Sequence, residues 1–182
     1  SRAGSLLGKR VLVTGCGPIG VLTIMAARRA GASEIVATDL SDFTLDIAHG
    51  AGADAGLNIA TSPDALRRFE ADKGYFDVMF ECSGAPVALA SGIAVLRPRG
   101  VAVQVGMGGD MTIPMQAVTA KELDLRGTFR FHEEFGVAVE LMQKQLIDVR
   151  PLITHTLPID RAPEAFDLAN DRSVAMKVQI AF

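Results

Sequence analysis

The sequence contains no tryptophan, a single tyrosine and only two cysteines among its 182 residues. Cys16 and Cys82 lie far apart and fit no CxxC pattern, so we expect neither disulfides nor a thiolate-rich metal site. This cysteine usage favours a reducing cytoplasm. The chain also lacks any apolar run near the roughly 20 residues that cross a bilayer, so we expect no membrane partner.

A basic surplus is missing as well. The chain has 18 basic and 21 acidic residues, which gives a net charge of -3 at neutral pH. Proteins that bind phosphate backbones normally carry a positive balance, so the composition disfavours a nucleic-acid partner. What remains is an ordinary globular composition, 49% hydrophobic and 21% charged, long enough for one domain with a core and a small appendage.

Short apolar segments alternate with helical ones along most of the chain. Strands are expected at residues 9–14, 34–38, 55–58, 76–81, 101–105 and 123–127. Helices are expected at residues 19–30 and 43–51, from Ser62-Pro63 onward, and at 86–96 and 135–146. Strands that alternate with helices of this length are typical of βαβ units and a parallel sheet. The predicted fold class is therefore α/β, with a doubly wound parallel sheet.

A glycine-rich loop lies between the first predicted strand and the first predicted helix. Residues 15–20 have the spacing G-x-G-x-x-G in the context in which this motif binds a dinucleotide. Gly15 would permit a tight turn, Gly17 would let the backbone approach a pyrophosphate, and Gly20 would let helix and strand pack closely. The helix N-terminus would offer free N–H groups to the phosphates. A plain strand-to-helix turn is the alternative.

An acidic residue ends the second predicted strand. Asp39 stands where a carboxylate can accept hydrogen bonds from the adenosine ribose of a bound dinucleotide. A 2′-phosphate about 4 Å away would be repelled by roughly 4 kcal/mol per unit charge at an effective dielectric near 20. The next three residues, Leu40 to Asp42, supply no arginine to offset this. The sequence therefore favours NAD over NADP, although Asp39 can also serve as a cap for the next helix.

Other classes of protein share parts of this pattern. S-adenosylmethionine methyltransferases also use a glycine-rich first turn and an acid after the second strand, but they seldom need the third glycine. A non-catalytic domain that senses NAD through dimerisation is a further alternative, because nothing in the nucleotide motif requires catalysis. Both alternatives would keep the α/β fold.

The pattern changes after residue 150. A strand at 153–157, a short helix at 163–170 and a strand at 176–182 do not continue the βαβ rhythm. In the last strand Met176, Val178, Ile180 and Phe182 alternate with other residues, so one face should be buried. We therefore divide the chain into a Rossmann NAD-binding domain over residues 1–150 and a separate C-terminal segment over residues 151–182.

Three further stretches, taken together with the glycine loop, resemble one family. They are Asp77 to Gly84, Val103 to Gly108 and the run from Lys121 to Phe131. Together with the glycine loop they resemble the medium-chain, zinc-type dehydrogenases, and the sorbitol and polyol branch fits best. The resemblance implies a parent enzyme that oxidises a secondary alcohol of a sugar acid or polyol and passes hydride to NAD. In such enzymes a catalytic zinc acts as a Lewis acid.

The resemblance also implies what this chain does not carry. The zinc ligands of such enzymes lie in an N-terminal GroES-like catalytic domain, for which the few residues before the first strand leave no room. His49, His132 and His155 form no recognised ligand set. We therefore expect no catalytic residue and no metal site here, zinc in the full-length parent only, and an inactive isolated chain. Residues 151–182 would be the return segment of the absent catalytic domain.

The family's cofactor contacts carry over residue by residue. They fall on Gly15, Gly17, Pro18, Ile19, Gly20, Asp39, Cys82, Ser83, Val105, Gly106, Met107, Phe129 and Arg130. Arg130 is also a candidate for binding substrate hydroxyls or a carboxylate. The stretch that resembles a dimer-forming edge strand consists of Met111, Thr112, Ile113, Pro114 and Met115. Two positions depart from the polyol enzymes, Thr44 in place of an arginine and Phe131 in place of a tyrosine.

Overall fold

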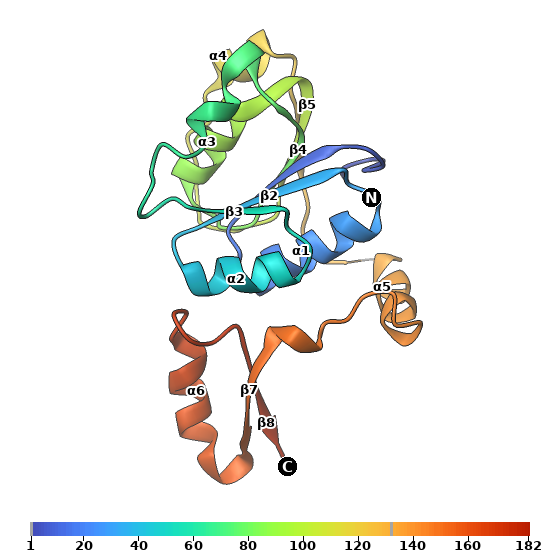
Figure 1. Cartoon of the computed structure of the whole chain (residues 1–182), viewed down its shortest axis with the longest axis vertical. Coiled ribbons are helices and arrows are strands. Elements are labelled where there is room, and N and C mark those ends of the chain that lie inside the picture. The colour runs from blue at the N-terminus through green and yellow to red at the C-terminus, as the bar shows by residue number, and fades with distance from the viewer. Residues whose placement is uncertain (1, 132) are drawn as a thin grey trace. The chain divides into compact units, whose positions relative to one another are not determined.

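The chain forms two compact units, Ser1–His132 and Glu133–Phe182. The structure is a computed structural model that describes residues 2–131 and 133–182 (Figure 1). The second unit includes a helix at Glu134–Gln143, upstream of residue 150. The functional division of the chain at residue 150 stays a prediction.

A six-stranded sheet forms the centre of the first unit. Its strands are β1 Arg10–Thr14, β2 Glu34–Asp39, β3 Ala55–Asn58, β4 Phe76–Glu81, β5 Leu96–Gln104 and β6 Asp124–Gly127. They lie in the order β3-β2-β1-β4-β5-β6, and every neighbouring pair is parallel. The order reverses between β1 and β4, which is the switch point at which doubly wound sheets bind ligands. The predicted α/β class is confirmed.

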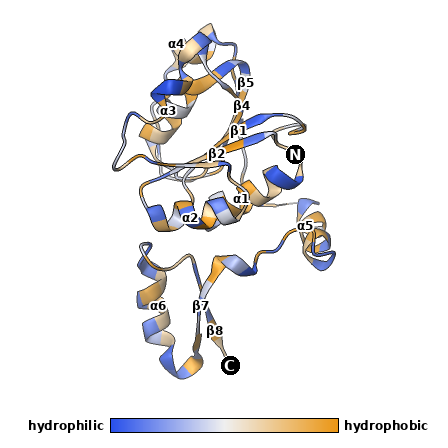
Figure 2. Cartoon of the chain, in the orientation of Figure 1, coloured by the Kyte–Doolittle hydropathy of each residue, from blue (hydrophilic) through white to orange (hydrophobic). Residues whose placement is uncertain are grey.

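Four helices connect these strands. They are α1 Pro18–Arg29, α2 Asp42–Gly50, α3 Pro86–Val95 and α4 Met115–Ala120. Figure 1 shows α1 and α2 on one face of the sheet and α3 and α4 on the other. Proline stands in the first turn of α1 and of α3, where its missing N–H costs nothing. Figure 2 shows apolar and polar residues alternating along α1 and α2, as expected for helices with one buried face.

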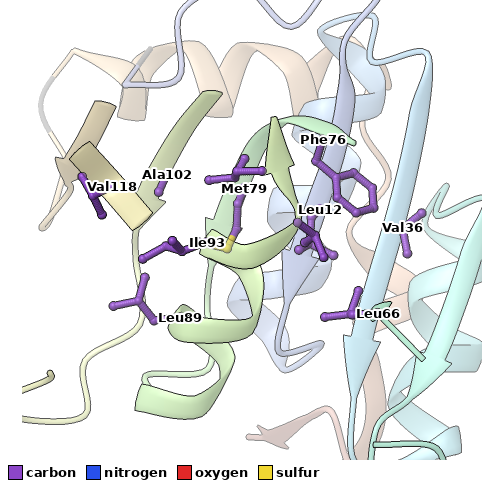
Figure 3. Packing of buried hydrophobic residues seen from close by; sticks show 11 residues of the cluster. Leu12, Val36, Leu66, Phe76, Met79, Leu89, Ile93, Ala102 and Val118 are labelled. Carbon is purple, nitrogen blue, oxygen red and sulfur yellow. The ribbon is translucent and has the colours of Figure 1, made fainter. Parts of the chain in front are cut away.

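The main core lies between the sheet and α3. Its buried members are Leu12, Val36, Leu66, Phe76, Met79, Leu89, Ile93, Val95, Leu96, Ala102 and Val118. Figure 3 shows Met79 of β4 close to Ile93 of α3. A Cβ on Gly92 would lie 1.8 Å from the sulfur of Met79, so the glycine lets α3 approach the sheet. This packing fixes the strand ends that carry the site.

The predicted helix after Ser62 is wrong. The chain makes turns there, followed by two short 3-10 helices at Arg67–Phe69 and Ala71–Lys73. The side-chain oxygen of Asn58 accepts hydrogen bonds from backbone N–H groups just downstream, which favours the turn over a helix. Asp72 and Lys73 have left-handed backbones with φ of 53° and 70°, which end any regular helix.

The predicted edge strand at 111–115 does not form within the single chain, and its pairing with a second chain stays a prediction. Residues 111–114 form no strand in this chain, and Met115 is the first residue of α4. Pro114 stands immediately before the helix, where it lacks the N–H that a sheet ladder would use. The outermost strand on this side of the described sheet is β6.

The second unit has its own small sheet. Its elements are α5 Glu134–Gln143, β7 Ile153–Pro158, α6 Ala162–Asn170 and β8 Lys177–Ala181. β7 and β8 pair in parallel, with α6 as the connection between them. Met176 is buried and Val178 and Ile180 are half-buried, as the alternation predicts, but Phe182 is exposed. Within the described residues, every helix is too short or too polar to cross a bilayer.

Candidate functional site

The glycine loop joins β1 to α1 and packs against the loop after β4. Gly15 has a φ of +83°, and a Cβ there would lie 2.8 Å from the backbone of Ser83. A Cβ on Gly20 would lie 1.8 Å from the carbonyl oxygen of Gly15. The fold itself therefore requires these two glycines.

Gly17 differs from the other two glycines. Its φ of -66° and ψ of -177° suit any residue, and nothing lies within 4 Å of a Cβ built there. It stands at the N-terminus of α1, which no side chain caps. The protein therefore leaves free space directly before uncapped helix N–H groups. A pyrophosphate fits such a place because the N–H groups and the helix dipole both attract an anion.

Asp39, the last residue of β2, hydrogen-bonds the glycine loop. One carboxyl oxygen accepts a hydrogen bond from the N–H of Cys16 at 2.6 Å. The other accepts from the N–H groups of Leu40 and Ser41 at 2.8 and 3.1 Å. The side chain is half-buried, so part of it faces outward beside Gly17's loop. Its partners precede α2, so the structure does not make Asp39 the cap of that helix.

Glu81 organises the centre of the site, and our sequence analysis gave it no role. It ends β4 and is fully buried, at 0% exposure. Its carboxyl group accepts hydrogen bonds from the N–H groups of Ser83 and Gly84 at 2.8 to 3.1 Å. The hydroxyl of Thr14 lies 3.2 Å away, the Ser83 hydroxyl also donates, and the Gln104 amide lies 2.5 Å away. One carboxyl group thus joins the ends of β1, β4 and β5.

The loops after β4 and β5 touch backbone to backbone. A Cβ on Gly106 would lie 2.3 Å from the nitrogen of Gly84, and one on Gly108 would lie 1.8 Å from its oxygen. Gly106 and Met107 also line a cavity of about 600 Å³ beside β5 and β6. The structure therefore brings the predicted residues of 15–20, 82–83 and 105–107 to one edge of the sheet.

Phe129 and Arg130 follow β6 at this same carboxyl edge. Phe129 is 64% exposed, and the guanidinium carbon of Arg130 lies 4.9 Å from the centre of its ring. Arg130 has a left-handed backbone with φ of +62°, a conformation that side chains other than glycine adopt at a cost. Their predicted roles toward cofactor and substrate stay predictions.

Both cysteines of the site are shielded. Burial, followed by the nearby Asp39 and Cys82, raises the pKa of the Cys16 thiol, which donates to the carbonyl of Thr38 at 3.6 Å. Burial raises the pKa of Cys82 to about 12, although a hydrogen bond with Thr23 acts in the opposite direction. Neither thiol is therefore a ready nucleophile.

We expect both thiols to resist alkylation in the folded chain. With a pKa of about 12, the thiolate fraction of Cys82 at pH 8 is about a thousandfold below that of a free cysteine. Iodoacetamide labelling followed by mass spectrometry should show slow reaction in the native chain and rapid reaction of both thiols in guanidinium. Native labelling of Cys82 at the rate of a free thiol would contradict this assignment.

The comparisons with known proteins place this geometry in a family. The model of zinc-binding dehydrogenases matches residues 18–144, which is most of the chain. The chain belongs to the zinc-binding dehydrogenase family. The resemblance predicted from the glycine loop and from the stretches at 77–84, 103–108 and 121–131 is thereby confirmed.

Individual dehydrogenases are similar over nearly the whole chain. L-idonate 5-dehydrogenase (NAD(P)(+)) of Escherichia coli is 43% identical over 100% of the chain, and human sorbitol dehydrogenase is 39% identical over 91%. The chain spans about half of these relatives, 52% and 48% of their lengths. The similarity to L-idonate 5-dehydrogenase agrees with our expectation from the segments at 73–78, 105–109 and 175–179.

Solved structures of dehydrogenases share the fold. The crystal structure of the Escherichia coli L-idonate 5-dehydrogenase matches with a TM-score of 0.93 at 43% identity, over 100% of this chain and 52% of that one. The 2R,3R-butanediol dehydrogenase of Bacillus subtilis matches with a TM-score of 0.89 at 27% identity, over 99% of this chain and 52% of that one.

The metal of the family has no ligand set in the described part of this chain. Residues 2–131 and 133–182 contain no group of three or more His, Cys, Asp or Glu side chains that could hold an ion. His49 hydrogen-bonds the carbonyl of Ala53, and His155 the hydroxyl of Thr154. His132 lies outside the described residues. The side chains described here therefore do not fit a zinc site.

Proposed function

We propose that this chain is the NAD-binding part of a polyol or sugar-acid dehydrogenase. The observation that carries the proposal is the free space before Gly17, at an uncapped helix N-terminus and beside the half-buried carboxyl group of Asp39. A pyrophosphate and an adenosine ribose are the ligand parts that such neighbouring features recognise.

Each part of the site then has one task. The N–H groups at the start of α1, around Ile19, bind the pyrophosphate, and Asp39 accepts hydrogen bonds from the ribose hydroxyls. The backbone of Val105 to Met107 orients the nicotinamide, with Phe129 and Arg130 beyond it. A bound NAD would supply the acceptor for a hydride from the alcohol carbon. Pro18, Cys82 and Ser83 shape the loops that face the rest of the cofactor.

The cofactor preference follows from the charge of Asp39. A 2′-phosphate would approach a carboxylate whose existing partners are all backbone N–H groups, with no basic side chain among them. Even half of the roughly 4 kcal/mol repulsion per unit charge would exceed tenfold in affinity. The Escherichia coli relative has NAD(P)(+) in its name, so the preference needs a direct measurement on this chain.

The test is a parallel titration of the whole 182-residue chain with NADH and NADPH, followed by nicotinamide fluorescence. We expect saturation by NADH and binding of NADPH at least about tenfold weaker. Equal or tighter binding of NADPH would overturn the preference assigned to Asp39. Absence of binding by both would overturn the proposal that this chain holds the site.

The same proposal extends to the parent protein. We propose oxidation of L-idonate to 5-ketogluconate, with sorbitol and threonine as the alternative substrates, and zinc bound outside this chain. The higher identity to the L-idonate enzyme supports the order. The activity of the full-length protein on each alcohol tests it. The two free cysteines suit a cytoplasmic location, and the isolated chain should be inactive.

Two structural proposals accompany this function. Residues 151–182 complete the absent catalytic domain, which is supported by the exposed side chains of Ile159, Phe166 and Phe182 in the second unit. Residues 111–115 mediate a homodimer, which is supported by the side chains of Thr112 and Met115, both exposed in the single chain. A partner chain would supply backbone hydrogen-bond partners to this stretch.

A further inference from the structure

The Glu81 network is unusual in its chemistry. Glu81 is fully buried, yet no ion pair joins it to a basic side chain among the residues that the structure describes. Neutral donors surround its carboxyl group instead, from backbone N–H groups, two hydroxyls and one amide. A buried carboxyl group is tolerated only where donors of this kind replace water.

Gln104 provides the connection from this carboxyl group to the loop after β5. Its amide nitrogen lies 2.5 Å from the Glu81 carboxyl group and 2.8 Å from the carbonyl oxygen of Gly106, and donates to both. The backbone adds two bonds of the same kind, because the N–H groups of Val105 and Gly106 donate to the Glu81 carbonyl at 2.8 Å. The backbone carbonyl of Glu81 and the side-chain amide of Gln104 therefore both hydrogen-bond the start of this loop.

The amide oxygen of Gln104 is in a different situation from the nitrogen. Its Oε1 atom is buried and has no hydrogen-bond partner. Turning the amide over would place an oxygen against the Glu81 carboxyl group and the Gly106 carbonyl, which are both acceptors. The two hydrogen bonds of the amide nitrogen thus fix the orientation of the amide, although they leave its oxygen without a partner.

Neither polar atom of the Gln104 side chain is placed to hydrogen-bond a ligand directly. Gln104 borders the cavity beside β5, but its Oε1 atom is enclosed by protein and its nitrogen is already engaged by two acceptors. What Gln104 can control is the orientation of the Gly106 peptide. That peptide belongs to the loop from Val105 to Met107.

We propose that Gln104, anchored by Glu81, is a positioning residue that sets the loop at 105–107 for the nicotinamide half of the cofactor. This inference rests on the proposed NAD function. It assigns Gln104 no part in holding the adenosine half, because Asp39 and the loop at 15–20 make no hydrogen bond with Gln104 among the described contacts. The two halves of the cofactor should therefore respond differently to a change at residue 104.

The test compares NADH with ADP-ribose, which lacks the nicotinamide, by calorimetry on the whole chain. In Gln104→Leu we expect the Kd of NADH to rise about tenfold, as for one lost hydrogen bond, and the Kd of ADP-ribose to stay within about twofold. The matched control is Gln116→Leu, an exposed glutamine on α4, which should change neither affinity. Gln104→Met, with an unbranched chain of similar size, gives the same comparison if the leucine variant folds poorly.

Each outcome decides a separate question. Equal weakening of both ligands would reduce Gln104 to a general structural role, and unchanged NADH binding would remove its role altogether. Both results overturn the inference while leaving NAD binding intact. A wild-type chain that binds neither ligand would instead overturn the proposed function. Glu81→Gln should weaken both ligands, because Glu81 also holds Thr14 and the Ser83 loop that supports Gly15.

Discussion

Gly17→Ala is expected to leave the free energy of unfolding equal or slightly higher and to weaken NADH binding by about a hundredfold. The new methyl group would meet no protein atom within 4 Å, and alanine adopts the φ of -66° and ψ of -177° without strain. The methyl group would instead occupy the space before the α1 N–H groups. A displaced pyrophosphate would lose charge-assisted hydrogen bonds worth about 3 kcal/mol.

Gly20→Ala, one turn further along, should behave in the opposite way. Its Cβ would lie 1.8 Å from the backbone oxygen of Gly15, which cannot move without opening the loop. We expect a loss of about 3 kcal/mol in stability, the upper range for overpacking. Gly50→Ala in α2, with nothing within 4 Å, is the control and should stabilise slightly. Thermal unfolding and NADH titration of the three variants distinguish these effects. NADH affinity unchanged in Gly17→Ala would place the phosphates elsewhere.

Replacement of Asp39 should reverse the cofactor preference but also loosen the site. In Asp39→Asn, the ratio of the NADPH Kd to the NADH Kd should fall by about 30-fold, because roughly 2 kcal/mol of repulsion per unit charge disappears. The remaining oxygen can accept from Cys16 or from Leu40 and Ser41, but not from all three. Absolute affinity for both cofactors should therefore drop.

The Asp39→Ala variant distinguishes the effect of the Asp39 charge from the effect of the hydrogen bonds that its carboxyl group accepts. It removes all three backbone partners of the carboxyl group, so we expect lower thermal stability and a weaker affinity for both cofactors than in Asp39→Asn. The ratio of the two Kd values should nevertheless be similar in the two variants, since both lack the charge. Fluorescence titration measures the ratio, and a ratio equal to that of the wild type would remove Asp39 from cofactor selection.

The parts of the fold predicted from sequence are those with local signals. β1, the glycine loop and α1 follow one another within 20 residues, and each carries its own signal of strand, turn or helix start. The start of a helix at Ser62-Pro63 also had such signals, yet the helix does not form. The chain must instead return to β5, where Gly74 comes so close that a Cβ would lie 2.2 Å from the oxygen of Leu96. A long-range contact overrides the local preference there.

The Glu81 network could not be predicted for the same reason. Thr14 and Gln104 are 67 and 23 residues away from Glu81 along the chain, and only the parallel pairing of β1, β4 and β5 brings them together. The sequence alone shows an acid at the end of an apolar strand, a pattern that a surface residue would also give. The stretch at 111–115 differs, because its alternating Met and Ile residues resemble a strand, whereas in the single chain α4 begins at Met115, directly after Pro114.

The neutral surroundings of Glu81 have a consequence for ionic strength. Salt weakens attractions between exposed opposite charges, and a site held together by such pairs would loosen as salt is added. Glu81 is enclosed, and its partners are dipoles without net charge. The carboxyl edge of the sheet should therefore keep its shape in concentrated salt. Any effect of salt on cofactor affinity would then come from screening of the phosphates themselves.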